Sequence, residues 1–403
     1  MSFVTHLECS ETGEHYPRGT VQNLSRTGKP LLVRYDLAAI RKAVTRDDLL
    51  RRAPEFWRYT EFLPMQDPAN AVRLGEVMTP LLPSRYLERS LGIGSVLIKD
   101  EGRLPTGSFK ARGLAVAVTM ARELGLTRLA MPTNGNAGAA LAAYCAAAGI
   151  ESYVFCPDDT PDVNVREISF QGAKTFLANG LINDCGRVVG EGKEAMAWFD
   201  ASTLKEPYRI EGKKTMGLEL AEQLGWRLPS AIFYPTGGGT GLIGMWKAFA
   251  ELGEVGWLDD ARPKMIVVQS EGCAPIVKAW QDGADHAPVW QNAFTIAAGI
   301  RVPVAIGDFL ILRAVRESNG WATAVSDEHL LQTRDAVAKE DGILLCPEGA
   351  ATVAALEIAA KEGRVGRTDE VVLFNCATGL KYPLPAGHQH LDLNQPVDYQ
   401  ALG

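Results

Sequence analysis

A glycine-rich loop lies between an apolar, strand-like segment and a helix-periodic segment, and this order constrains the fold. The apolar run 231–234 precedes the loop TGGGTG at 236–241, and the helical pattern begins at Leu242. Glycines allow backbone N–H groups to converge, and the N-terminus of a helix favours negative charge. The segment therefore predicts an anion-binding loop at the end of a strand in an α/β fold.

A lysine at the start of another helix-periodic segment is the main candidate for chemistry. Lys110 follows a polar turn in the run PTGSFKARG at 105–113. Taken alone, such a lysine is usually a solvated surface charge. A further polar turn, TNGNAG at 133–138, separates a short apolar strand from an alanine-rich helix. An amine, an anion-binding loop and an asparagine turn together can hold a phosphorylated aldehyde as a Schiff base, so we predict pyridoxal 5′-phosphate as the cofactor.

Strand signals alternate with long helical patterns along much of the chain. Apolar runs at 231–234, 264–269 and 371–374 are the clearest strands. This alternation predicts an α/β architecture with parallel strands. The chain has 403 residues, 46% of them hydrophobic, which suggests two or three domains or lobes around a large core.

Charge and hydropathy argue against several kinds of partner. The formal net charge is −7, without a basic stripe or an aromatic-basic alternation, so we expect no nucleic-acid binding. Residues 1–13 lack the pattern of a signal peptide, and no stretch approaches the ~20 apolar residues that span a bilayer. Seven scattered cysteines suit reduced thiols. We therefore expect a cytoplasmic protein that acts on a small molecule and has no membrane contact.

The order of these motifs resembles that of the threonine synthases, in the fold type II (tryptophan synthase β-like) group of pyridoxal-phosphate enzymes. The resemblance extends from about residue 7 to about residue 384. It implies two open, twisted, mostly parallel sheets flanked by helices, with the cofactor in the interdomain cleft, and a homodimer. The implied parts are an N-terminal extension packed on the large domain (1–75), a large cofactor-binding domain in two segments (76–115 and 227–403) and a small inserted domain (116–226).

The resemblance also implies roles for individual residues. Lys110 forms the Schiff base, Asn136 hydrogen-bonds the 3′ oxygen of the cofactor, and Cys376 lies beside the pyridine nitrogen. Thr133 and Arg209 bind the substrate, and a planar guanidinium such as that of Arg209 suits a phosphate dianion. The implied ligands of the cofactor phosphate are Gly237, Gly238, Gly239, Thr240 and Gly241.

Three of these positions also have a purely structural interpretation. Cys376 is alternatively a small buried residue that faces nothing special. Arg209 is alternatively part of an exposed basic cluster near a helix start. Glu348, in the run CPEGAA at 346–351, resembles a position near the cofactor ring, but a carboxylate there equally suits a helix cap.

The resemblance implies that O-phospho-L-homoserine loses phosphate from Cγ and takes up water at Cβ to give L-threonine. Several positions depart from the family pattern: many threonine synthases carry an aspartate where this chain has Ala111. They also carry hydroxyl and amide side chains at the positions of Ala137, Thr203 and Leu204. The run Lys-Ala-Arg-Gly is closer to the hydroxyamino-acid dehydratases of the same fold, which convert serine or threonine to a 2-oxo acid and ammonia. A dehydratase, or another β-elimination or replacement enzyme, is therefore the alternative.

Two functions of other kinds are considered. Residues 239–244 match the pattern G-x-G-x-x-G of dinucleotide-binding folds. A nicotinamide enzyme would need an acidic residue at the end of the next strand, whereas Glu251 and Glu254 lie in a helix-to-loop stretch, and Lys110 would have no role. A sensor that binds the cofactor without catalysis is the remaining alternative.

The N-terminal segment resembles the place where threonine synthases often carry a zinc knuckle with two cysteine pairs. The corresponding residues here are Cys9, Thr12, Ser25 and Thr27. One thiolate cannot build a four-ligand zinc site. The six histidines show no paired metal spacing in the sequence, so we predict no structural metal.

Overall fold

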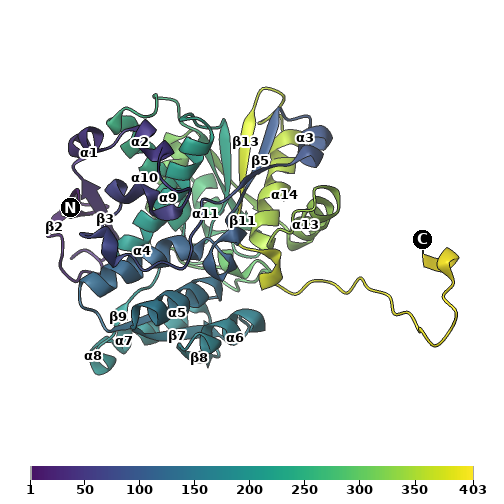
Figure 1. Cartoon of the computed structure of the whole chain (residues 1–403), viewed down its shortest axis with the longest axis horizontal. Coiled ribbons are helices and arrows are strands. Elements are labelled where there is room, and N and C mark those ends of the chain that lie inside the picture. Colours follow the sequence, from purple (N-terminus) through teal and green to yellow (C-terminus); the bar gives the residue numbers. More distant parts are fainter. Residues whose placement is uncertain (1, 403) are drawn as a thin grey trace.

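The computed structural model describes residues 2–402, and helices surround three β-sheets in that range (Figure 1). The largest sheet has six strands in the order β12-β11-β10-β13-β5-β4. All its neighbouring strands run parallel except the edge strand β4, which pairs antiparallel with β5. Its strands are β4 (Leu81–Pro83), β5 (Ser95–Asp100), β10 (Ala231–Pro235), β11 (Lys264–Ser270), β12 (Trp321–Val325) and β13 (Glu370–Asn375). The predicted parallel α/β architecture is confirmed, and the three predicted strands are β10, β11 and β13.

A second, fully parallel sheet of four strands in the order β8-β7-β6-β9 comes from the middle of the chain. Its strands are β6 (Arg128–Pro132), β7 (Glu151–Pro157), β8 (Lys174–Ala178) and β9 (Phe199–Asp200). Figure 1 shows it with helices α5 to α8 below the main body of the molecule. This second sheet lies wholly inside the predicted insert 116–226, which supports the proposed division, and the exact domain boundaries stay a prediction.

The fourteen α-helices within residues 2–402 connect the strands and cover the sheets. They are α1 (Leu37–Ala43), α2 (Arg46–Leu50), α3 (Arg85–Leu91), α4 (Lys110–Glu123), α5 (Asn136–Ala148), α6 (Asp162–Phe170), α7 (Ile182–Glu191), α8 (Lys193–Met196), α9 (Tyr208–Gln223), α10 (Thr240–Val255), α11 (Pro275–Gln281), α12 (Asp308–Glu317), α13 (Asp327–Glu340) and α14 (Pro347–Lys361). No helix in the described range is both long and apolar enough to cross a bilayer.

Both faces of the six-stranded sheet are buried, which explains why its strands are continuous apolar runs. Alternate residues of a strand point to opposite faces. In β10, Ile232 and Tyr234 join the core that includes α9 and α10, whereas Ala231 and Phe233 join the core beneath α14. A parallel sheet covered on both faces needs apolar side chains at every position of its inner strands.

The N-terminal segment forms a small antiparallel sheet, in the order β2-β1-β3, that packs on the large core. Its strands are β1 (Val4–Cys9), β2 (His15–Tyr16) and β3 (Leu31–Tyr35). At the end of β3, the Tyr35 hydroxyl donates to Glu211 of α9 at 2.8 Å. At the other end of the chain, a tail without strands or α-helices follows Tyr382 and extends away from the body (Figure 1).

A buried network of charges joins α4 to β5 and α9. The Arg112 guanidinium donates to Glu101 at 2.6 Å and to Glu219 at 2.7 Å, and Lys99 donates to Glu219 at 2.9 Å. These four side chains have no exposed surface. A buried charge that loses its partner keeps its desolvation cost. The network therefore holds the helix that carries Lys110 in one position relative to its neighbours.

We expect Glu219→Ala to destabilise the protein by about 3–5 kcal/mol, because Arg112 and Lys99 would stay buried without their shared partner. The matched control is Asp162→Ala, which removes the exposed pair with Arg166 on α6 and should cost at most about 1 kcal/mol. Urea unfolding followed by circular dichroism measures both. Equal effects of the two changes would contradict this role of the network.

Candidate functional site

A cavity of about 420 Å³ lies where the carboxyl ends of strands from the two parallel sheets meet. Its wall comes from the residues after β6, β10 and β13 and from the start of α4. Open α/β sheets bind ligands at this edge. The predicted site residues that line it are Lys110, Thr133, Asn136, Gly237, Gly238, Gly239, Thr240 and Cys376. Gly241 and Arg209, both inside the described range, lie outside the lining.

Lys110 is the first residue of α4, and backbone contacts determine where it points. Phe109, at the N-cap, donates its N–H to the carbonyl of Cys376 at 2.8 Å, so the turn before α4 is attached to the end of β13. Farther along, α4 crosses α9 in backbone contact, because a Cβ at Gly212 would collide with the carbonyl oxygen of Arg112. These contacts place the Lys110 amine in the wall of the cavity.

Burial, together with the positive charge of Arg209, lowers the pKa of Lys110 to about 8, while the carboxylate of Glu348 opposes the shift. A second lysine, Lys213, is fully buried beside it and donates to the carbonyl of Phe109. Burial and the nearby Lys110 hold the pKa of Lys213 well below its ordinary value. Near neutral pH a larger share of Lys110 than of an ordinary lysine is therefore a free amine, which is the nucleophilic form.

The glycine loop leaves the N-terminus of α10 open toward the cavity. Gly239 is the N-cap, with φ +74°, and no side chain in the described part of the chain caps the helix there. A Cβ at Gly237 would lie 2.8 Å from Val302, and one at Gly238 would lie 2.8 Å from Thr203. The glycines thus leave the backbone N–H groups uncovered by side chains. The sixteen-residue helix directs its positive end at the cavity.

Gly241 allows α10 to pack closely on β10, and it does not line the cavity. A Cβ there would collide with the hydroxyl of Tyr234 on β10. The glycine therefore lets α10 lie directly on the strand, and its predicted contact with the phosphate stays a prediction. Tyr234 itself lines the cavity, although the sequence analysis did not select it. Its place in β10 immediately before the loop was the available signal.

The turn at 133–138 contributes amide groups to the opposite wall. Asn136, the first residue of α5, is buried, and its Oδ1 has no hydrogen-bond partner within residues 2–402. The Thr133 hydroxyl accepts from the N–H groups of Gly135 and Gly138 at 3.0 and 3.1 Å, which orders the turn. Asn134, missed by the sequence analysis, donates to the carbonyls of Ala298 and Arg301 at 3.0 Å each.

Cys376 and Glu348 close the end of the cavity beneath β13. Burial raises the pKa of Cys376, so this residue is a neutral thiol. Glu348 accepts from the N–H of Gly299 at 2.7 Å and from the hydroxyl of Tyr382. The predicted alternative of Glu348 as a helix cap is wrong, because Cys346 caps α14 through the N–H of Gly349. Glu348 instead lines the cavity.

Arg209 lies behind the cavity wall. It is 1% exposed, so the alternative of an exposed basic cluster is wrong. Its guanidinium donates to the carbonyl of Ala201 at 2.9 Å, and its Nε has no partner in the described part of the chain. Two other cations, Lys205 and Arg187, line the cavity directly. Lys205 lies four residues before Arg209 in the sequence.

These features fit pyridoxal 5′-phosphate. The free amine of Lys110 suits its aldehyde, and the bare, uncapped start of α10 suits its phosphate. The unpartnered amide oxygen of Asn136 needs a donor, which a hydroxyl group supplies. Glu251, considered for a nicotinamide site, is instead buried on α10 in an ion pair with Lys214 at 2.8 Å.

Comparisons with known proteins agree with this chemistry. Residues 72–377 match the sequence model of a family described as "Pyridoxal-phosphate dependent enzyme". The threonine synthase of Methanocaldococcus jannaschii is 34% identical over 93% of this chain and 92% of its own length. The threonine synthase of Methanosarcina acetivorans is 35% identical over 94% of this chain and 92% of its own length.

Solved structures share the fold at lower sequence identity. Maize serine racemase is 18% identical, with a TM-score of 0.64 over 79% of this chain and 89% of that chain. Threonine deaminase isoform 2 of Solanum lycopersicum is 20% identical, with a TM-score of 0.62 over 75% of this chain and 84% of that chain. These matches confirm the predicted fold type II architecture. With its full-length relatives and its lysine-bearing cavity, the chain belongs to the threonine synthase family of pyridoxal-phosphate-dependent lyases.

Proposed function

We propose that this enzyme converts O-phospho-L-homoserine and water to L-threonine and phosphate. The observation that carries the proposal is that the cavity offers two separate sites for anions. One is the open N-terminus of α10. The other would use Lys205 and Arg187, which also line the cavity and pair with Asp200 at 3.4 Å and with Glu191 at 3.3 Å. The cofactor and the substrate each carry a phosphate, whereas the hydroxyamino acids used by dehydratases carry none.

The residues around the cavity would first bind and orient the substrate. Arg187 and Lys205 are the cations able to contact a substrate phosphate, because both line the cavity. Arg209 contributes positive charge from behind, and a direct contact would require its side chain to move out of the wall. Thr133 orders the turn before α5, whose N-terminus suits the substrate carboxylate. We therefore keep Thr133 and Arg209 as proposed substrate-binding residues.

Lys110 is the proposed catalytic residue. Pyridoxal 5′-phosphate, when bound, supplies an electron sink for negative charge at the substrate Cα. The Lys110 amine would take the proton from Cα and move protons at the neighbouring carbons. With a pKa of about 8 it exchanges protons readily near neutral pH. Asn136, Gly237, Gly238, Gly239, Thr240 and Gly241 would hold the cofactor, and the neutral Cys376 thiol would face its ring nitrogen.

One argument for the dehydratase alternative, the run Lys-Ala-Arg-Gly, is weakened by the role of Arg112 in the fold. Arg112 in the run Lys-Ala-Arg-Gly belongs to the buried network with Glu101 and Glu219, so its presence reflects packing of α4. The alternative then depends on the positions that depart from the family pattern, of which Ala137, Thr203 and Leu204 line the cavity. We further propose that the enzyme is a cytoplasmic homodimer, which the resemblance to its relatives supports.

We expect the purified enzyme to release phosphate and L-threonine in equal amounts from O-phospho-L-homoserine. Lys110→Ala should abolish both products, because it removes the proposed base. Colorimetric phosphate determination and amino-acid chromatography measure them. Formation of a 2-oxo acid from L-serine or L-threonine, without phosphate release from O-phospho-L-homoserine, would instead establish the dehydratase.

Lys205→Ala and Arg187→Ala should each lower kcat/KM for O-phospho-L-homoserine roughly 10- to 100-fold, since a hydrogen bond to a charged group is worth about 1.5–3 kcal/mol. The loss should appear mainly in KM, and the absorbance of the bound cofactor should not change. Arg166→Ala, an exposed arginine of α6, is the control. Unchanged kinetics in both cavity variants would show that the substrate phosphate binds elsewhere.

Lys110 in the cofactor-free protein should react with acetic anhydride half-maximally at about pH 8. The amine reacts only when deprotonated, so labelling rises with pH through the pKa. Arg209→Leu removes a nearby positive charge and should move this midpoint to higher pH. Mass spectrometry of the Lys110 peptide measures the labelling, with the other lysine peptides as internal standards. A midpoint near that of a free lysine, about 10.4, would contradict the lowered pKa.

A further inference from the structure

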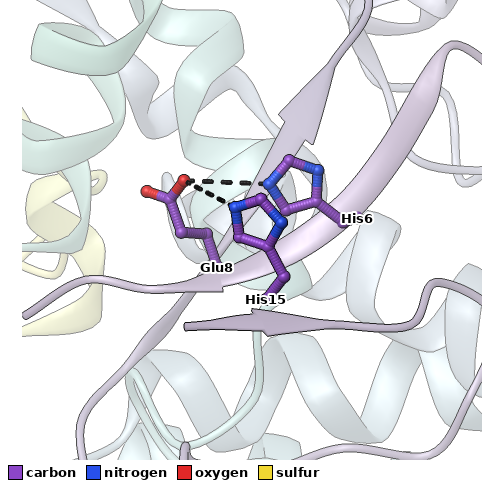
Figure 2. Close-up of side chains that lie close together, drawn as sticks. All are labelled: His6, Glu8 and His15. Atoms are coloured by element: carbon purple, nitrogen blue, oxygen red, sulfur yellow. Dashed lines mark ion pairs between the residues drawn. The ribbon is translucent and has the colours of Figure 1, made fainter. Parts of the chain in front are cut away.

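Two histidines and a glutamate lie together on one face of the N-terminal hairpin (Figure 2). His6 and Glu8 are two residues apart in β1, so their side chains share a face. The antiparallel register pairs Glu8 with His15 of β2. The two imidazole rings stack with their centroids 3.8 Å apart. The hairpin therefore creates a histidine pair that the separation of His6 and His15 in the sequence conceals.

A chain of hydrogen bonds determines which nitrogen of His6 is free. The Thr5 hydroxyl donates to the carbonyl of Arg34 at 3.1 Å, which uses its only hydrogen. With its hydrogen directed at Arg34, the Thr5 oxygen, 2.9 Å from Nδ1 of His6, can accept from that nitrogen. In the neutral ring, Nε2 then carries a lone pair, and it is buried without a hydrogen-bond partner within residues 2–402. An imidazole oriented in this way is prepared to bind a cation through Nε2.

Glu8 is held in a matching orientation. Its Oε1 accepts from Nε and Nη2 of Arg34 at 3.1 and 2.6 Å. Its Oε2 lies 3.7 Å from Nε2 of His6 and 3.9 Å from Nε2 of His15 (Figure 2). These distances exceed those of hydrogen bonds. One carboxylate oxygen and two ring nitrogens thus converge on a common point.

We propose that His6, Glu8 and His15 bind a divalent transition-metal ion, with Zn²⁺ as the expected occupant. Zinc binds imidazole nitrogen at 2.0–2.1 Å and carboxylate oxygen at 2.0–2.2 Å, so neighbouring ligands of a tetrahedral ion lie roughly 3.4 Å apart. The observed separations to Oε2 need a contraction of only a few tenths of an ångström. Two imidazoles and one carboxylate suit this class of ion and disfavour Mg²⁺ and Ca²⁺.

The surroundings leave room for a fourth ligand and a path of entry. The His15 side chain is 64% exposed, whereas those of His6 and Glu8 are about one quarter exposed. Water can therefore complete the coordination from the side of His15. The ion would join β1 to β2, which otherwise pair over only two residues. The site would stabilise the N-terminal hairpin, and it is separate from the cavity that contains Lys110.

Cys9 provides a sharp control because it is close in sequence but belongs to the other face of β1. Burial opposes ionisation of this thiol, but hydrogen bonds with Ser25 and Thr12 lower its pKa to about 6. Such a thiol can also bind zinc. Any metal held by Cys9 would carry a sulfur ligand, whereas the proposed site holds only nitrogen and oxygen.

The experiment is calorimetric titration of tag-free, chelator-treated holoenzyme with ZnCl₂, and a parallel titration with CoCl₂ followed by absorbance. We expect one equivalent of each ion to bind, with a cobalt spectrum that lacks a thiolate charge-transfer band. Glu8→Gln, His6→Ala and His15→Ala should each abolish binding of that equivalent. His15 is largely exposed, so His15→Ala should fold normally, and the absorbance of the bound cofactor checks this.

Two variants are expected to bind as the wild type does. They are Cys9→Ala and the double change His388→Ala with His390→Ala, which alters the histidine pair in the C-terminal tail. Loss of binding in either variant would show that the metal binds at the substituted residues instead, which would overturn the proposal. Absence of zinc binding by the wild type, or full binding by His15→Ala, would also overturn it.

Discussion

The buried ion pairs of Arg112 hold the helix on which the rest of the site depends. Arg112 lies two residues after Lys110 on α4 and joins Glu101, after β5, to Glu219 on α9. A charge without exposed surface cannot leave its partners at low cost, so the position of α4 is strictly determined. The backbone contact of α4 with α9 at Gly212 strengthens this restraint. The reactive amine is therefore carried by a rigid element.

The cavity combines this amine with several sources of positive potential. The N-termini of α5 and α10 face it, Lys205 and Arg187 line it, and Arg209 lies behind its wall. These groups attract anions. Burial is the main reason why a protonated Lys110 is unfavourable, and the charge of Arg209 adds to it. Cys376, as a neutral thiol, adds no charge at the opposite end.

Local patterns predicted the parallel architecture and the cofactor, and together with the family resemblance they predicted part of the cavity lining. Lys110, Asn136 and the loop at 237–240 all follow strand ends, where parallel strands place their ligands. The prediction did not reach Asn134, Tyr234, Arg187 and Lys205. Asn134 and Tyr234 adjoin the predicted turn and loop, whereas Arg187 and Lys205 lie in the cavity because of how the two sheets face each other. Arg209 shows the reverse, because the resemblance selected this residue but its burial was not visible in the sequence.

The sequence by itself determined the chemistry available to this protein: a lysine after a tight turn, a bare glycine loop before a helix, and alternating strands and helices. These features depend on neighbours in the chain, so local steric and hydrogen-bonding rules reveal them. Only the tertiary structure decided which distant groups meet. Burial within the folded protein lowers the pKa of Lys110, and the pairing of β1 with β2 brings His15 beside His6. Desolvation and strand register depend on contacts across the fold, which a pattern in one segment does not encode.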